Sequence, residues 1–321
     1  MRMGTERCSA EGRRCGSRGG KSHNEHVQKG EHIMKRKIVS FFILVCLFFQ
    51  CCVAYAIDTD EGEIILGIDD MPYLTEIYSR KELRSCTKLK LVSSKHGDSI
   101  FCVDDLLCMP NIEELYVAEG AYLDDYSKLR AFQNLKVLRL HNQSISDISF
   151  VAYLTKLEKI DFRHNLIQNI DPIGELKHLR IVNLSYNNIS DISALKSSAD
   201  LELLNLSFNE NVSDLSAISL LSKMESLSIS GTNINDLSPI SSLTNMDFLR
   251  FDGCKVEDIT CISGLTKLTY LDMRYNSISN IEPLSKMHEL EFLYLVGNPI
   301  TDYSVLYSLE HISPEIAMEK P

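Results

Sequence analysis

The sequence predicts an α/β solenoid, a curved right-handed superhelix with a parallel β-sheet on its concave face and short helical or 3-10 turns on its convex face. Three observations predict it. Apolar motifs of the form Leu-x-x-Leu-x-Leu recur every 22 or 23 residues from Ile112 onward. An amide residue usually follows each motif after three residues, and Asp or Asn follows four residues later. A unit of this length cannot bury its apolar side alone, so the units must stack.

Nine units occupy residues 112–311. In each unit the fourth and sixth residues point to one side of a short strand and the third and fifth to the other, because side chains alternate along a strand. At roughly 4.8 Å per strand the stack makes a sheet about 38 Å long, and the wider convex side bends it. The units begin at Ile112, Leu135, Leu157, Leu179, Leu201, Met224, Met246, Leu268 and Leu290.

Amide side chains at the ninth position of the units predict a structural ladder of hydrogen bonds. An amide has donors and an acceptor, so it can satisfy backbone groups where the chain leaves the strand. Thr232 and Cys254 interrupt the series and offer fewer hydrogen bonds, so we expect the ladder to be weakest there. The amide residues are Gln143, Asn165, Asn187, Asn209, Asn276 and Asn298.

Short polar residues at the thirteenth position predict how each unit turns back. Asp and Asn favour helix N-caps, and a proline three residues later is tolerated in a first helical turn. We therefore expect one helical or 3-10 turn per unit, with these carboxylates as caps rather than as a row of metal ligands. The residues are Asp147, Asn169, Asp191, Asp214, Asp236, Asp258, Asn280 and Asp302, with prolines at 172, 239 and 283.

Residues 57–111 come before the regular units and are expected to close one apolar end. Residues 86–111 match a degenerate tenth repeat, with Leu89 and Leu91 in its strand and 93–99 looped out. Residues 57–85 are then an N-terminal cap, in which the run 73–83 is expected to be helical.

The other apolar end of the stack is expected to be covered by a short C-terminal tail, residues 312–321. It offers only Ile312, Ile316 and Met318 to cover the leucines of the last unit. A homodimer formed through this edge is therefore a hypothesis that the sequence raises.

Residues 34–56 have the features of a secretory signal peptide. A basic trio at 35–37 precedes an apolar run over 38–49, and the small residues Ala54 and Ala56 suit cleavage after Ala56. The run is short for a membrane-spanning helix, which needs about 20 residues. We expect export, and no membrane span once the signal is removed.

The 33 residues before this signal are expected to be an untranslated leader or a disordered segment. They are rich in Gly, Arg and Ser. The tripeptide at 29–31 can be encoded by a sequence that resembles a bacterial ribosome-binding site, just upstream of Met34. We interpret Met34 as the true start in a bacterium.

The charge of the chain is divided unevenly. Residues 1–56 hold ten of the 33 basic and four of the 44 acidic residues, which leaves 23 basic and 40 acidic residues and a formal charge of −17 from Ile57 onward. Such a body repels phosphate backbones, so nucleic acid is not expected as a partner. Five cysteines also follow Ala56, and whether the first three include a disulfide or are buried thiols stays open. They are Cys86, Cys102, Cys108, Cys254 and Cys261.

The repeat units, for example Asn-Asn-Ile-Ser-Asp-Ile at 187–192, resemble those of the internalins, a family of leucine-rich-repeat surface proteins of bacteria. The resemblance covers residues 112–311. It implies a cap before the repeats and ligand binding by the concave face, with host proteins as the ligands of pathogenic members. Two departures put wall anchoring and host-cell invasion in doubt, because the sequence shows no immunoglobulin-like domain after the repeats and no LPXTG-type sorting motif.

Side chains at the third, fifth, seventh and eighth positions are expected on the concave face, where they form two candidate ligand-binding patches. Exposed aromatics beside arginine are typical of binding hot spots, although these rings could also pack on each other. The aromatic patch is Phe248, Arg250, Tyr270, Asp272, Arg274, Tyr275, Phe292 and Tyr294. The polar patch is Arg139, His141, Lys159, Asp161, Arg163 and His164.

The polar patch invites a metal-binding or acid–base interpretation, but a solvated charged surface is favoured, since no matching carboxylate pair accompanies the histidines. Between the patches, Ser226, Ser228, Ser230 and Gly231 form a saddle of small residues where a ligand could approach the backbone.

These patterns predict a secreted or cell-surface recognition protein with no catalytic residues, no metal and no cofactor. Tyr270, Phe292 and Tyr294 are the expected anchors for a macromolecular ligand, and the polar patch sets its orientation. A host or bacterial surface protein is the expected partner, with a glycan left open. The alternatives are an intracellular scaffold similar to the phosphatase regulatory subunit, which the signal peptide disfavours, or the recognition part of a larger assembly. An enzyme of the leucine-rich-repeat ubiquitin ligase kind would need a further domain.

Overall fold

The computed structural model describes residues 62–68, 71, 74–94, 97–309 and 311–312. The expected leader, the signal peptide, the start of the cap and tail residues 313–321, with Ile316 and Met318, lie outside these residues. Over the residues that are described, no helix has both the length and the apolar character that crossing a membrane requires.

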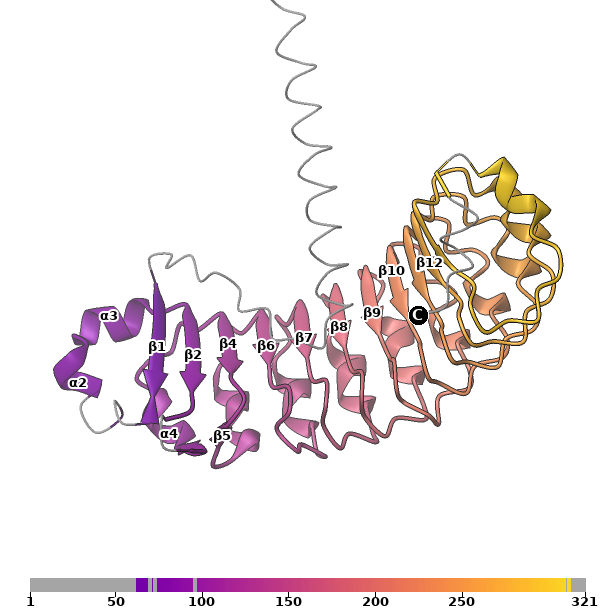
Figure 1. Ribbon diagram of the computed structural model, residues 1–321. Helices are drawn as coiled ribbons and strands as arrows, with labels where there is room; N and C mark the ends of the chain where they lie inside the picture. The colour runs from indigo at the N-terminus through magenta and orange to yellow at the C-terminus, as the bar shows by residue number, and fades with distance from the viewer. Residues whose placement is uncertain (1–61, 69–70, 72–73, 95–96, 310, 313–321) are drawn as a thin grey trace, which may run out of the picture. The chain divides into compact units, whose positions relative to one another are not determined.

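One parallel sheet of eleven strands runs through the described part of the chain and confirms the predicted solenoid. Strands in equivalent positions of successive units pair directly, as Leu249 of β11 does with Leu271 of β12. Within the repeats the ribbon bends toward the side that carries the strands, with the 3-10 turns on the outside (Figure 1). The strands are β1 (Glu63–Gly67), β2 (Lys88–Val92), β4 (Glu114–Val117), β6 (Val137–Arg139), β7 (Lys159–Asp161), β8 (Ile181–Asn183), β9 (Leu203–Asn205), β10 (Ser226–Ser228), β11 (Phe248–Arg250), β12 (Tyr270–Asp272) and β13 (Phe292–Tyr294).

The apolar positions of the units fill one continuous core between the sheet and the turns. In the unit that starts at Leu179, the motif residues Leu179, Val182 and Leu184 are fully buried, as is Leu195 of its return arm. Equivalent apolar positions of the other units are buried as well, so one core runs along the stack. Truncating one such leucine to alanine typically costs about 2 to 5 kcal/mol.

Return arms of 3-10 helix connect the strands, as the sequence predicted. Prolines 172, 239 and 283 lie in the first turn of their helices, where a missing N–H does no harm. The 3-10 helices are η2 (Tyr126–Ala131), η3 (Ser149–Tyr153), η4 (Asp171–Glu175), η5 (Ser193–Ser197), η6 (Ser216–Ile218), η7 (Ser238–Ile240), η8 (Thr260–Ile262), η9 (Glu282–Lys286) and η10 (Ser304–Ser308).

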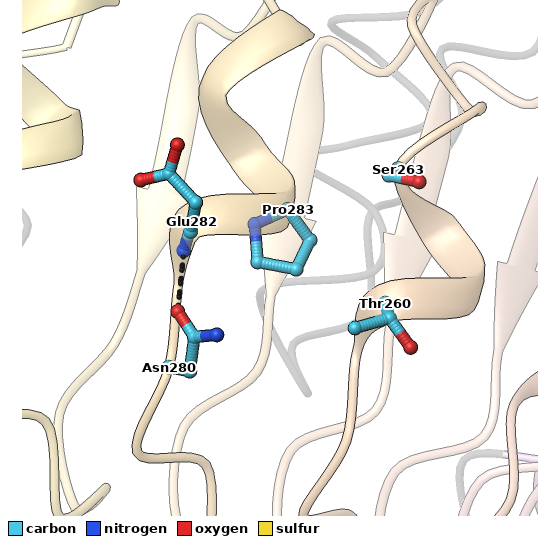
Figure 2. Close-up of a pocket in the computed structure, with 5 residues that line it drawn as sticks. All are labelled: Thr260, Ser263, Asn280, Glu282 and Pro283. Carbon is cyan, nitrogen blue, oxygen red and sulfur yellow. Dashed lines mark hydrogen bonds between the residues drawn. The ribbon is translucent and has the colours of Figure 1, made fainter.

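The polar residues at the thirteenth position do not occupy the N-caps, so the expectation that they are caps is wrong by one residue. Asp191 Oδ1 accepts a hydrogen bond of 2.7 Å from Ser193 N, while the N-cap of η5 is Ile192, which makes no side-chain bond. Asn280 makes the same contact with Glu282 N at 2.9 Å (Figure 2). A side chain that bonds the backbone two residues on forms an Asx turn, and this bond lowers the pKa of Asp191.

The N-terminal end departs from the expected cap in two ways. The helical run expected over 73–83 is divided into α2 (Leu74–Ile77) and α3 (Arg80–Ser85). Ser79 interrupts the run because its side chain forms a capping box with Glu82. The cap also contains β1, which pairs with β2 and extends the sheet by a strand that the sequence pattern did not reveal.

The degenerate repeat has its strand β2 at Leu89 and Leu91, the residues proposed for it. Ser99, which was expected in a loop, instead begins β3 (Ser99–Phe101), and β3 pairs with β5 (Ala121–Leu123) in a separate two-stranded sheet. The short helix α4 (Val103–Leu106) follows β3 and takes the place of a 3-10 turn.

The amides at the ninth position connect each unit to its neighbours. Asn187 Nδ2 donates to the carbonyls of Phe162 and Leu184, both at 2.9 Å, and its Oδ1 accepts from Ile167 N at 3.0 Å. Thr232 supplies only a hydroxyl, which donates to Ile229 O at 2.7 Å, and the weakly polar Cys254 thiol lies 3.2 Å from the same oxygen. The ladder is thinnest at these two units.

All five cysteines in the described residues are free thiols. Cys86 is buried in the core, and this burial raises its pKa to about 11. Cys86 and Cys254 are therefore small apolar groups of the core.

Removing the ladder amide of one unit should destabilise the fold more than removing the Thr232 hydroxyl. Asn187→Ala leaves the Ile167 N–H without its partner in the interior and removes one of the two asparagine hydrogen bonds at each of the Phe162 and Leu184 carbonyls, so we expect a loss of about 1 to 3 kcal/mol. Thr232→Ala is the matched control with a single bond, and about 1 kcal/mol is expected. Urea unfolding measures both, and equal losses would contradict the ladder interpretation.

Restoring the amide at the weakest unit should have the opposite effect. In Cys254→Asn the new side chain can donate to Ile229 O and accept from Ile234 N, as Asn276 donates to Phe251 O and accepts from Val256 N. We expect a gain of about 1 kcal/mol in the free energy of unfolding. A Cys254→Ala variant, which adds no polar group, should show no gain in the same measurement.

Candidate functional site

The concave face divides into three zones, formed by the third, fifth and seventh residues of successive units. The polar zone lies on β4, β6 and β7, the serine zone on β8 to β10, and the aromatic zone on β11 to β13. Because equivalent residues of neighbouring units lie one strand apart, each zone is a set of short columns of side chains. The structure thus keeps the two predicted patches apart, with the predicted saddle between them.

In the polar zone, Arg139, His141, Asp161 and Arg163 are half-buried. Arg163 Nε lies 3.6 Å from Asp161 Oδ2, at partly exposed positions where an ion pair contributes little. Burial lowers the pKa of His141, so its ring is neutral at pH 7. The polar zone thus presents the neutral imidazole of His141 beside two arginines, of which Arg163 is paired with Asp161.

Tyr116 extends the polar zone and was missed by the sequence reasoning. Its ring stacks on that of His141 with centroids 5.5 Å apart, and Lys90 Nζ lies 5.2 Å from its centroid. Tyr116 is the fifth residue of the first unit. Because the fifth residue of each unit faces the concave side, the repeat pattern was enough to predict Tyr116 on this face.

The serine zone is lined by short side chains, most of whose polar groups already make hydrogen bonds within the protein. The hydroxyls of Ser207 and Ser228 are 2.7 Å apart, and Ser185 Oγ donates to Asn183 Oδ1 at 2.9 Å. Ser226, Ser228 and the neighbouring Ser230 are buried. Because these side chains are short and most of their polar groups are already hydrogen-bonded, the zone leaves room for a ligand but offers it few free hydrogen-bonding groups.

The aromatic zone is a packed cluster, which corrects the expected set of anchors. Tyr270 is fully buried, with Phe248 stacked on it at 4.4 Å between centroids and Tyr294 at 5.6 Å. Phe248 is itself only 5% exposed. Tyr270 and Phe248 therefore support the surface, whereas Phe292, 36% exposed, and the half-buried Tyr294 remain open to a ligand.

A charged network joins this cluster. The Asp272 carboxylate is fully buried and is bound by Arg274 in two hydrogen bonds of 2.7 and 2.9 Å, while Arg250 Nε lies 3.5 Å away. A carboxylate without water needs such partners. Asp272 is therefore not a contact residue, and its role is to fix the two guanidiniums at the surface.

Asp252 completes the network and was also missed, although the seventh position of its unit placed it on the face. It accepts a hydrogen bond of 2.6 Å from Arg250 Nε and a short one from Ser230. Arg274 in turn lies over the ring of Tyr294, 5.2 Å from its centroid. The guanidiniums of the predicted patch are thus held in place before any ligand arrives.

Tyr275 does not join this cluster. It occupies the eighth position, where its backbone φ is +54°, and its side chain is 52% exposed. The eighth residues form a separate row along the rim, just beyond the carboxyl ends of the strands.

Asp247 is an unusual acid at the edge of the aromatic zone. Burial, with the charge of Glu225 in the preceding unit, raises its pKa to about 6. Asp247 directly precedes Phe248, the ring that stacks on Tyr270. Among the residues that the structure describes, no group of three or more His, Cys, Asp or Glu side chains is placed to hold a metal ion.

Comparisons with known proteins identify the repeats. Two family models of leucine-rich repeats match, one over residues 133–175 and 266–308 and the other over 175–196. No curated protein matches in sequence.

Solved structures are similar over longer spans. An internalin of Listeria monocytogenes (inlF) is 25% identical with a TM-score of 0.66, covering 73% of this chain and 68% of its own. Internalin C2 of the same organism is 28% identical with a TM-score of 0.55, covering 56% and 80%. The ectodomain of the Arabidopsis receptor kinase HAESA, solved with a peptide hormone, shares the fold at 20% identity and a TM-score of 0.57, covering 67% and 38%.

Replacing Asp247 should change how stability depends on pH. Its pKa is about 6 in the folded protein against 3.8 ordinarily, so the folded state binds more protons between these values and stability falls as pH rises through them. Asp247→Asn should therefore raise the free energy of unfolding at pH 7 and leave it unchanged below pH 3.8.

Urea unfolding at several pH values measures this difference. Glu225→Gln is the matched control, since it removes the lesser of the two causes and should give a smaller gain at pH 7. A gain from Asp247→Asn that is the same at every pH would show that the carboxylate is not strained by its surroundings.

Proposed function

We propose that this leucine-rich-repeat protein of the internalin type is an exported recognition protein that binds a protein ligand across its concave face. The similarity to internalins supports a surface or extracellular role, and so does the signal-like segment at 34–56. The HAESA ectodomain, whose structure holds a peptide hormone, has the same architecture. The ligand itself is to be found by experiment.

The observation that carries this proposal is the aromatic zone. Phe292 and Tyr294 remain open to solvent beside Arg274, whose guanidinium is fixed by the buried Asp272. Aromatic rings with arginine dominate binding energy in protein interfaces. They are also already ordered here, so little conformational entropy is lost on binding.

The polar zone serves to orient the ligand. Arg139 and Arg163 lie beyond the serine zone, at the other end of the face, and the chain from Ile57 onward is otherwise acidic. Charges at the edge of an interface mainly affect the association rate and its dependence on salt. The low serine floor then lets a ligand reach both ends.

The double variant Phe292→Ala/Tyr294→Ala should lose the ligand while keeping its fold. Truncating two exposed rings typically costs at least 2 kcal/mol each in a hot spot, about a thousandfold together. Capture from extracts of host and bacterial surfaces, followed by titration of the captured protein, measures the loss. Circular dichroism should show a thermal midpoint close to that of the parent.

Two matched controls separate binding from folding. Tyr307→Ala removes an 83% exposed ring from η10 on the convex side and should leave binding intact. Tyr270→Ala removes a buried ring and should destabilise by about 3 to 5 kcal/mol. If the double variant captures the same protein with the affinity of the parent, the concave aromatic zone is not the binding site.

A further inference from the structure

Basic side chains gather at the end of the concave face that lies nearest the N-terminal cap, on β2, β6 and β7 (Figure 1). They alternate along the chain with buried residues such as Leu89 and Ile160, so they point away from the core. All five are half-buried, and each keeps part of its side chain in solvent. They are Lys88, Lys90, Arg139, Lys159 and Arg163.

Two of these five cations are paired with carboxylates. Lys88 Nζ lies 4.0 Å from Glu114 Oε1, and Arg163 Nε lies 3.6 Å from Asp161 Oδ2. In the part of the chain that the structure describes, no carboxylate is within ion-pair distance of the other three, Lys90, Arg139 and Lys159. Three unpaired positive charges therefore stand together on a chain whose formal charge from Ile57 onward is −17.

Other acidic side chains lie at the borders of this surface. Glu63 of β1 is beside Lys88, its partner in the strand register, at the first strand of the sheet. Glu119 accepts a hydrogen bond of 3.0 Å from Asn142 Nδ2, whose residue belongs to the row at the rim. In the other direction the register leads from Asp161 to neutral residues, Asn183 and Asn205. The cationic surface is therefore short and has an end on each side.

The Tyr116 ring separates two of the unpaired cations. Lys90, Tyr116 and Arg139 are in register on β2, β4 and β6. Lys90 Nζ lies 5.2 Å from the centroid of the Tyr116 ring, a cation–π contact that places its charge before a ligand arrives. Lys159 follows on β7, which pairs with β6. The three charges are thus spread across four neighbouring strands.

This spread indicates the shape of the anion that fits. From β2 to β7 the sheet advances three strands, about 14 Å at 4.8 Å per strand. Because Lys90 is held over Tyr116, a single carboxylate or phosphate cannot pair with cations at both ends. An extended peptide carries every second side chain on the same side, about 7 Å apart. Two or three acidic residues of such a peptide therefore match the length of the row.

A long polyanion fits this surface less well than a short acidic segment. Beyond β2 it would meet Glu63, and elsewhere it would run over an acidic body that repels it. A segment of a protein can end its run of acidic residues where the cations end. Charge complementarity therefore favours an acidic stretch of a protein as the occupant.

We propose that the protein ligand presents a short acidic segment, with two or three carboxylates on one side of an extended chain, to Lys90, Arg139 and Lys159. This inference rests on the proposed function, because it names the part of the ligand that faces the polar zone. The aromatic zone then binds a different part of the same ligand, across the serine zone.

Calorimetric titration of the full chain with hexaglutamate at low ionic strength tests the inference, with hexaglutamine as the uncharged counterpart. We expect hexaglutamate to bind and hexaglutamine not to bind. Arg139→Gln/Lys159→Gln should lower the affinity for hexaglutamate about tenfold, the combined effect of two partly exposed ion pairs. Added salt should weaken the binding to the parent protein, because it screens exposed charges.

Lys196→Gln/Lys286→Gln is the matched control. It removes the same charge from exposed positions of η5 and η9, and the affinity for hexaglutamate should change less than about twofold. Phe292→Ala/Tyr294→Ala should also leave this binding intact, so a failure of the aromatic zone and a failure of this inference appear in different variants.

Three results would overturn the inference. The first is that hexaglutamate does not bind the parent protein at low ionic strength. The second is that the two lysine and arginine double variants lose affinity equally, which would show a general attraction of charge. The third is that a sulfated hexasaccharide binds at Arg139 and Lys159 and hexaglutamate does not compete with it.

Discussion

The structure depends on the pairing of parallel strands in a register of one repeat unit. Leu249 pairs with Leu271, and Leu271 with Leu293, so every position of the repeat is placed beside its counterpart one unit away. Leucines in equivalent positions then fill one core. The ladder asparagines maintain this register, because each bonds backbone groups of its own unit and of the one before.

Residues at the same position of successive units form a column of side chains. This arrangement also decides which side chains are exposed. At the third position Phe248, Tyr270 and Phe292 fall on neighbouring strands, so the middle ring is enclosed by its own neighbours and leaves the surface. At the fifth and seventh positions, acids and arginines alternate, and Asp272 becomes the buried partner of Arg250 and Arg274. Of the three rings in the third-position column, only Phe292 of the last unit is open to a ligand.

The residues at the eighth position also form a column, but their side chains are not enclosed by their neighbours. Here the column lies at the turn after the strand, where φ is positive and the side chains point along the rim. Rings in adjacent units stack without becoming enclosed, and the column stops where Gly231 and Gly253 carry no side chain. Two aromatic rows on one solenoid thus differ in exposure because they lie at different places in the repeat.

The sequence by itself determined the solenoid, the parallel sheet, the short helical return arms and the repeat positions that face the concave side, because a fixed period repeats each local choice nine times. It missed Tyr116 and Asp252, which belong to the two patches. It did not reveal β1 or the interruption at Ser79, where no period exists, nor that the thirteenth-position carboxylates form Asx turns one residue before the caps. Only the tertiary structure decided which concave side chains are accessible. Whether Tyr270 is an anchor or a buried support depends on the rings of the two units beside it, and the burial of a side chain is a property of its neighbours in space.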